Sequence, residues 1–145
     1  MDDLPDDVEA LRRVRFFEDL TPEDLDRIAG IGERRSFEPG EAIVHKDDDT
    51  GGLYILLSGT ATVEAGGKQH TLQAGDFTGE MGLLAKKPRS ATVTAAEPVE
   101  AMVIETMYFK PFLIKNPSVA VHLLEVVADR LREVQDRVER QAGPS

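Results

Sequence analysis

The chain carries at residues 77–93 the stretch FTGEMGLLAKKPRSATV, in which a glycine turn and a short apolar run precede an arginine. Gly79 removes a side chain where a backbone must approach a ligand closely. Residues 81–84 can form one helical turn, whose unpaired N–H groups and partial positive charge favour an anion. Pro88 fixes the chain just before Arg89, whose planar guanidinium can donate two parallel hydrogen bonds to phosphate oxygens. The stretch therefore predicts a binding site for a phosphate group.

Two further polar residues accompany these phosphate ligands. Glu80, when ionised, is an acceptor-only group that suits a sugar hydroxyl and not the phosphate. Ser90 adds a small donor beside Arg89, and residues 91–95 alternate as a strand that would anchor the arginine on rigid backbone. A lone glutamate or arginine is usually a solvated surface charge, but the glycine, the proline and the strand in register favour ligand binding. The prediction becomes a phosphate attached to a ribose.

The stretch resembles the phosphate-binding cassette of the cyclic nucleotide-binding domain family, which occurs in catabolite activator proteins, protein kinase regulatory subunits and cyclic nucleotide-gated channels. The family pattern is Gly-Glu-(Leu/Met/Ile)-(Ala/Gly)-Leu, a short variable loop and Pro-Arg-(Ser/Thr/Ala)-Ala-(Thr/Ser)-Val, which residues 79–83 and 88–93 fit. By this resemblance Glu80 binds the ribose 2′-hydroxyl and Arg89 binds the exocyclic oxygens of the cyclic phosphate. The ligand-binding residues that it implies in the cassette are Gly79, Glu80, Met81, Gly82, Leu83, Arg89, Ser90 and Ala91.

The resemblance implies a regulatory domain without catalysis, which binds a ligand and needs no cofactor. The expected ligand is 3′,5′-cyclic AMP more than cyclic GMP. The Ser90 hydroxyl can reach the phosphate or, as in some relatives, the guanine amino group, which leaves modest discrimination open in either direction. Ligand binding is expected to close the C-terminal helices over the site. The alternative is a structural dimerisation or interaction module whose cassette does not bind a nucleotide.

Composition agrees with one compact domain. The chain has 145 residues, of which 41% are hydrophobic, enough to bury one sizeable core. It has no cysteine, which excludes disulfides and thiolate metal sites. The net charge of −10 argues against nucleic acid as a partner. An acidic N-terminal end and only short apolar runs predict a cytoplasmic protein without membrane insertion.

Strand signals recur between two helical ends. Short apolar or alternating segments, separated by turn residues, predict strands at 41–45, 52–57, 60–64, 68–72, 90–95 and 99–104. Capping residues and helical starts predict helices at 7–11, 22–29 and 117–141. The segments Pro39-Gly40-Glu41 and Ala74-Gly75-Asp76 look like equivalent turns.

Many short strands at regular spacing favour a closed roll or a sandwich. The resemblance implies a mainly β fold, a jelly-roll β-barrel (double-stranded β-helix) with flanking helices. We therefore expect one domain over residues 1–145, with N-terminal helices in 1–34 and a β-roll in 35–105 that contains the cassette at 77–93. The C-terminal helices, in 106–142, are expected as a hinge helix and a long lid or dimer helix.

The last predicted helix carries an apolar stripe, made of Leu124, Val127, Leu131, Val134 and Val138. The spacing fits either packing on the domain's own barrel or a symmetric dimer seam, and it is too short to decide between them. In catabolite activator relatives this helix both dimerises and caps the purine, and the resemblance places Gln135 where it could hydrogen-bond a base edge. The expected partners are a cyclic nucleotide and either a second copy, through residues 124–138, or an unidentified effector protein.

Metal chemistry is not expected. His45, His70 and His122 are scattered and lack the paired spacing of metal ligands. Residues 47–49 are acidic but lack the alternating ligands and terminal glutamate of a calcium loop.

Overall fold

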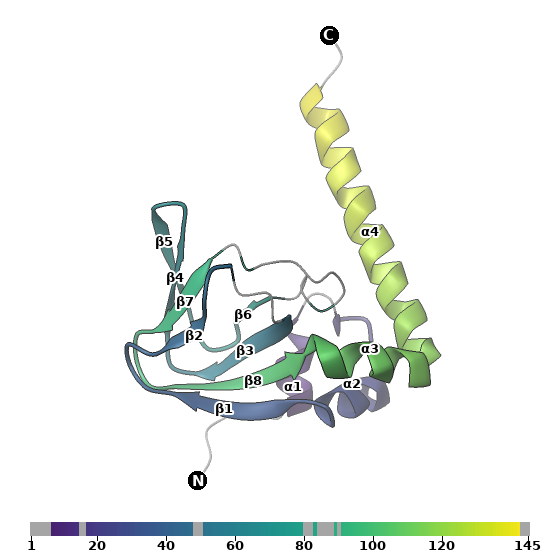
Figure 1. The fold of residues 1–145 in the computed structure, drawn as a ribbon. Coiled ribbons are helices and arrows are strands. Elements are labelled where there is room, and N and C mark those ends of the chain that lie inside the picture. Colours follow the sequence, from purple (N-terminus) through teal and green to yellow (C-terminus); the bar gives the residue numbers. More distant parts are fainter. Residues whose placement is uncertain are drawn as a thin grey trace.

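The computed structural model describes residues 7–14, 17–47, 51–79, 83, 89 and 91–142. It contains two four-stranded sheets, in the strand orders β1-β8-β3-β6 and β2-β7-β4-β5. The strands are β1 (Glu33–Phe37), β2 (Ala42–Val44), β3 (Gly52–Ser58), β4 (Ala61–Ala65), β5 (Lys68–Leu72), β6 (Phe77–Thr78), β7 (Thr92–Ala95) and β8 (Val99–Glu105). The helices are α1 (Asp7–Arg12), α2 (Pro22–Ala29), α3 (Thr106–Lys115) and α4 (Pro117–Ala142). Helices α1, α2 and α3 lie together toward one end of the sheets (Figure 1).

This architecture confirms the predicted jelly roll with flanking helices, although the sheets are not closed into a barrel. All ladders between the described strands are antiparallel. The edge strands β2 and β6 are only three and two residues long. Strands this short offer few N–H and C=O groups to a second neighbour, and each pairs with one strand in the described part of the chain. The result is a sandwich of two sheets.

The two turns that looked equivalent in the sequence make the same pair of hydrogen bonds. Gly40 has a φ of 87° and donates its N–H to the carbonyl of Ala95 at 2.7 Å, while the Ala95 N–H donates to the carbonyl of Glu41 at 2.9 Å. Gly75 has a φ of 95° and donates to the carbonyl of Leu56 at 2.8 Å, and Leu56 donates back to the carbonyl of the residue after Gly75. Positive φ favours glycine at both turns, which explains the repeated residue type.

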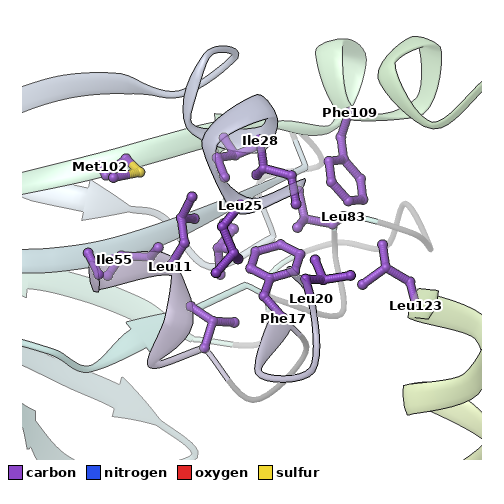
Figure 2. Packing of buried hydrophobic residues seen from close by; sticks show 14 of the residues in the cluster. Leu11, Phe17, Leu20, Leu25, Ile28, Ile55, Leu83, Met102, Phe109 and Leu123 are labelled. Atoms are coloured by element: carbon purple, nitrogen blue, oxygen red, sulfur yellow. The ribbon is translucent and has the colours of Figure 1, made fainter. Parts of the chain in front are cut away.

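Alternation of side chains along β3 divides the buried residues into two cores. Leu53, Ile55 and Leu57 face the helices, whereas Leu56 faces the second sheet. The core under the helices, shown in Figure 2, includes Leu11, Phe17, Leu20, Leu25, Ile28, Ile55, Leu83, Met102, Phe109 and Leu123. The core between the sheets includes Ile43, Val44, Leu56, Ala61, Val63, Leu72, Val93, Ala95, Val99 and Ala101.

Helix α4 packs on the body of the domain through its base. Val119, Leu123 and Val126 are buried in the core under the helices. The Nδ1 atom of His122 lies 3.6 Å from Oδ2 of the buried Asp24, which brings the same stretch against α2. The base of α4 is therefore part of the folded body.

Beyond this base, α4 extends away from the sheets (Figure 1). Of its apolar stripe, Val127 packs against the core, but Leu124 is 68% exposed, Leu131 is 65% exposed and Val138 is 58% exposed. The alternative in which the stripe packs on the domain's own barrel is therefore wrong for these exposed side chains. Something other than the described residues must cover them if they are to be buried.

Candidate functional site

The structure describes part of the predicted cassette. Gly79, Leu83, Arg89 and Ala91 are described, whereas the predictions at Glu80, Met81, Gly82 and Ser90 fall outside the described residues.

Arg89 is half-buried and is held by the first residues of β3. Its Nη2 atom donates a hydrogen bond to the carbonyl oxygen of Gly52 at 2.5 Å. Its Cζ atom lies 5.5 Å from the centroid of the Tyr54 ring, within the range of a cation–π interaction. These two contacts come from one strand and restrain the position of the guanidinium.

Gly79 lies against the guanidinium of Arg89 and the carbonyl oxygen of Gly52. Its φ is +89°, a conformation that side chains rarely adopt. A Cβ atom built on Gly79 would overlap the guanidinium of Arg89 and the carbonyl oxygen of Gly52. Glycine is thus required here both by conformation and by space, because of Arg89 and Gly52. The close approach of Gly79 to a ligand stays a prediction.

The chain at Arg89 and just after it is also anchored. The Asp47 N–H donates to the carbonyl of Arg89 at 2.8 Å, and Asp47 itself has a positive φ of 71°. At Thr92, where β7 begins, the side-chain Oγ1 atom accepts a hydrogen bond from the Lys46 N–H at 3.0 Å. Ala91, between them, is half-buried and packs against the core between the sheets. The arginine therefore projects from restrained backbone.

Leu83 joins the cassette to the helices. Its side chain is fully buried in the core under the helices, which it shares with Phe109 of α3 and Leu123 of α4. Figure 2 shows Leu83 close to Phe109 and between the helical elements of this core. Leu83 therefore links the cassette to buried residues of α3 and α4.

A charged cluster lies where β8 passes into α3. Arg35 donates from Nη2 to Glu105 at 2.7 Å and from Nε to Glu33 at 3.1 Å. These hydrogen bonds, that to Glu105 first, raise the pKa of Arg35 above its usual value. Glu33 and Tyr54 both pair with Val103 in the sheet, so the cluster shares a sheet face with the ring that contacts the cassette arginine.

The same junction is bonded to the strand that holds Arg89. Glu105 pairs with Gly52, and the N–H of Thr106, the first residue of α3, donates to the carbonyl of Gly51 at 3.2 Å. The start of α3 is therefore one hydrogen bond away from the residues that position the cassette arginine. Tyr54, Arg35 and Glu105 were not predicted from the sequence.

Gln135, predicted to cap a base, lies on the exposed part of α4. It follows Val126, the last buried residue of the described helix. Within the described residues no hydrogen bond joins Gln135 to Gly79, Arg89 or Ala91. Its role stays a prediction.

Metal ligands do not gather in the part of the chain that the structure describes, where no group of three or more His, Cys, Asp or Glu side chains could hold an ion. Among the described helices, none combines the length and the apolar character needed to cross a membrane.

Comparison with known proteins gives a consistent result. Residues 34–116 match the sequence profile of the family described as Cyclic nucleotide-binding domain. A cGMP-dependent protein kinase of Toxoplasma gondii is 46% identical over 88 residues, which are 60% of this chain and 9% of that protein. The Cyclic AMP receptor protein of Thermus thermophilus is 32% identical over 124 residues, which are 81% of this chain and 57% of that protein. The chain thus spans only part of these relatives.

Among solved structures, the N-terminal domain of a transcriptional regulator from Streptomyces coelicolor A3(2) superimposes with a TM-score of 0.81 at 27% identity. The match covers 94% of this chain and 99% of that domain.

Proposed function

The chain belongs to the cyclic nucleotide-binding domain family, and we propose that it is the ligand-binding part of a sensor for 3′,5′-cyclic AMP. The observation that carries this proposal is the placement of Arg89 against Gly52, Tyr54 and Gly79. A guanidinium restrained in position loses little conformational freedom when it binds a phosphate, so less of the binding energy is spent on ordering it.

Each cassette residue has a proposed role. Arg89 donates to the exocyclic phosphate oxygens, and Glu80 accepts from the ribose 2′-hydroxyl. The backbone of residues 79–83 and the Ser90 hydroxyl complete the phosphate site. Gln135 hydrogen-bonds a base edge when α4 closes.

The preference for cyclic AMP over cyclic GMP rests on the named relatives. The Thermus relative, matched over 81% of this chain, is a cyclic AMP receptor protein by name, whereas the Toxoplasma kinase, matched over 60%, is named for cyclic GMP. We favour cyclic AMP because the match to its receptor extends over more of the chain. A preference for cyclic GMP above tenfold, or about 1.4 kcal/mol, would overturn this choice and leave the fold and the phosphate site untouched.

The proposed response to the ligand is a change in the packing of the C-terminal helices. Leu83 shares a core with Phe109 and Leu123, so cassette conformations that bind phosphate favour one arrangement of α3 and α4 over another. The ligand shifts this equilibrium by its difference in affinity for the two arrangements. The exposed stripe of α4 is the proposed output surface, toward a second copy or an effector protein.

A second function is supported by the same stripe. Leu124, Leu131 and Val138 are exposed along one helix, and a structural dimerisation module with a non-binding cassette would use this surface alone. The two functions differ in whether a nucleotide binds.

Titration calorimetry of the purified chain with cyclic AMP and with cyclic GMP tests the proposal. Arg89→Ala should remove charge-assisted hydrogen bonds of about 1.5–3 kcal/mol each and weaken binding more than tenfold. Glu80→Ala should weaken it less, through the ribose. Arg12→Ala, which removes a surface arginine that pairs with Glu9, is the matched control and should bind normally.

Two further measurements separate a sensor from a scaffold. Ligand at a hundred times its dissociation constant should stabilise the fold by about 2.7 kcal/mol, seen as a rise in melting temperature. Amide exchange in residues 126–138 should slow if α4 is the element that responds. The absence of both effects, with no heat of binding, would leave the structural-dimer function.

A further inference from the structure

Tyr54 occupies a position that touches both halves of the phosphate-binding cassette. Its ring lies under the guanidinium of Arg89, with 5.5 Å between Cζ and the ring centroid. Its backbone pairs with Thr78, the residue immediately before Gly79. The Arg89 half and the Gly79 half of the cassette therefore meet on a single residue of β3.

The surroundings of Tyr54 favour a flat ring that accepts a cation. Tyr54 is half-buried at the edge of the core between the sheets, while its neighbours Leu53 and Ile55 face the opposite core. An aliphatic residue could fill the same half-buried position, but it has no electron-rich face for a guanidinium. What distinguishes the ring from an aliphatic side chain here is its contact with Arg89.

The nearest other guanidinium on this sheet face is balanced by carboxylates. Arg35 is hydrogen-bonded to Glu105 and Glu33, at 2.7 and 3.1 Å. Its charge is therefore matched by partners that lie on β1 and at the end of β8. Tyr54 adds to the raised pKa of Arg35 as the smallest of its causes, while its ring contacts the cassette arginine.

We propose that Tyr54 is a positioning residue for Arg89, which holds the guanidinium in the plane needed to bind a cyclic phosphate. This inference rests on the proposed function and adds to it a determinant of affinity that lies outside the cassette. Gly52 fixes one nitrogen of the guanidinium through its carbonyl, and the Tyr54 ring fixes the tilt. With either restraint removed, less of the arginine's conformation is fixed before the ligand binds.

The test compares Tyr54→Leu, Tyr54→Phe and Tyr108→Leu by titration calorimetry with cyclic AMP and cyclic GMP. Tyr54→Leu should weaken binding about fivefold to tenfold, within the range of a partly desolvated cation–π contact. Tyr54→Phe keeps the ring and should restore affinity to within about twofold of the wild type. Tyr108→Leu makes the same change on the exposed surface of α3 and should leave affinity unchanged.

A second readout needs no nucleotide. Tyr54 and Tyr108 are the only tyrosines of the chain, so ring signals in an NMR spectrum of tyrosine-labelled protein are readily assigned with the Tyr108→Phe variant. Arg89→Ala should shift the Tyr54 ring signals, and Arg12→Ala should not. This measurement stays informative if Tyr54→Leu fails to fold.

The outcomes separate the two proposals. If the wild-type chain binds neither nucleotide, the proposed function fails, whatever the ring signals show. If the wild type binds and Tyr54→Leu binds equally well, or if Tyr54→Phe loses as much as Tyr54→Leu, the positioning role of Tyr54 is overturned. Tyr54 ring signals that do not shift in Arg89→Ala would also overturn the positioning role.

Discussion

A single added methyl group at residue 79 should damage this domain in two separable ways. Gly79→Ala places a side chain at a φ of +89° and drives it into the carbonyl of Gly52 and the guanidinium of Arg89. The conformational part costs about 1–2 kcal/mol, because L residues avoid positive φ. The steric part must be relieved by movement of either Gly52 or the arginine.

Movement of Gly52 would break the ladder between β3 and β8, where this residue pairs with Glu105. Movement of Arg89 is therefore the easier route. It gives up the hydrogen bond to Gly52 and the contact with Tyr54, worth about 1.5–3 and 0.5–1 kcal/mol in partly buried surroundings. We expect Gly79→Ala to lower the free energy of unfolding by about 3–6 kcal/mol in total, as the sum of these contributions.

Gly40→Ala is the matched control. Gly40 has nearly the same φ, +87°, but a Cβ atom there meets nothing within 4 Å. The free energy of unfolding of Gly40→Ala should fall only by the conformational cost of positive φ, about 1–2 kcal/mol. For a domain of this size, that lowers the melting temperature by roughly 3–6 °C. The melting temperature of Gly79→Ala should fall by roughly 9–18 °C.

Thermal unfolding and calorimetric titration of both variants measure these effects. Cyclic AMP affinity should drop at least tenfold in Gly79→Ala, since the displaced arginine no longer faces the phosphate, and should be unchanged in Gly40→Ala. Equal melting temperatures for the two variants, or normal affinity in Gly79→Ala, would refute the account of Gly79 as the residue that seats the arginine.

Three other substitutions test separate parts of the structure. Thr21→Ala removes the side chain that accepts from the Asp24 N–H at 3.1 Å and should cost about 1 kcal/mol of stability by thermal unfolding, whereas Thr71→Ala on the exposed face of β5 should be neutral. Leu83→Ala leaves a cavity at a fully buried site and should lower the free energy of unfolding by about 2–5 kcal/mol. It should also reduce the protection of α4 amides that ligand binding produces, and unchanged protection would show that α4 does not respond through Leu83. Leu131→Asp places a charge in the exposed stripe and should abolish any concentration-dependent self-association seen by sedimentation, while unchanged association would move the interface elsewhere.

Where local chemistry determines structure, the sequence was sufficient. Glycine at 40 and 75 predicted two equivalent turns, and both make the same pair of backbone hydrogen bonds. Capping residues predicted a helix at 22–29, and α2 spans Pro22–Ala29 with the Thr21 side chain as its cap. The family motif predicted the jelly roll and placed Gly79 and Arg89 in one site, where the structure finds them in contact.

Features that depend on distant partners were missed. β1 reads Glu-Arg-Arg-Ser-Phe, which has no apolar alternation, and it is a strand because β8 pairs with it. α3 was expected only through the family resemblance, as a hinge helix, because it contains Pro111, a residue that disfavours a helix interior. Phe109 and Phe112 are buried in the core and hold the helix. Tyr54 and Arg89 are far apart in the chain, so their contact carries no local signal.

Because only the base of α4 packs on the domain, a small rotation at the base displaces the far end much further. The helix is clamped up to Val126, and the residues from there to Ala142 rise 1.5 Å each, which gives an arm of roughly 24 Å. A rotation of about 10° at the clamped end would carry the far end through roughly 4 Å, the width of a side-chain contact. A slight repacking around Leu123 would thus displace the C-terminal end of α4 by the width of a side-chain contact, enough to change which side chains a partner protein could touch there.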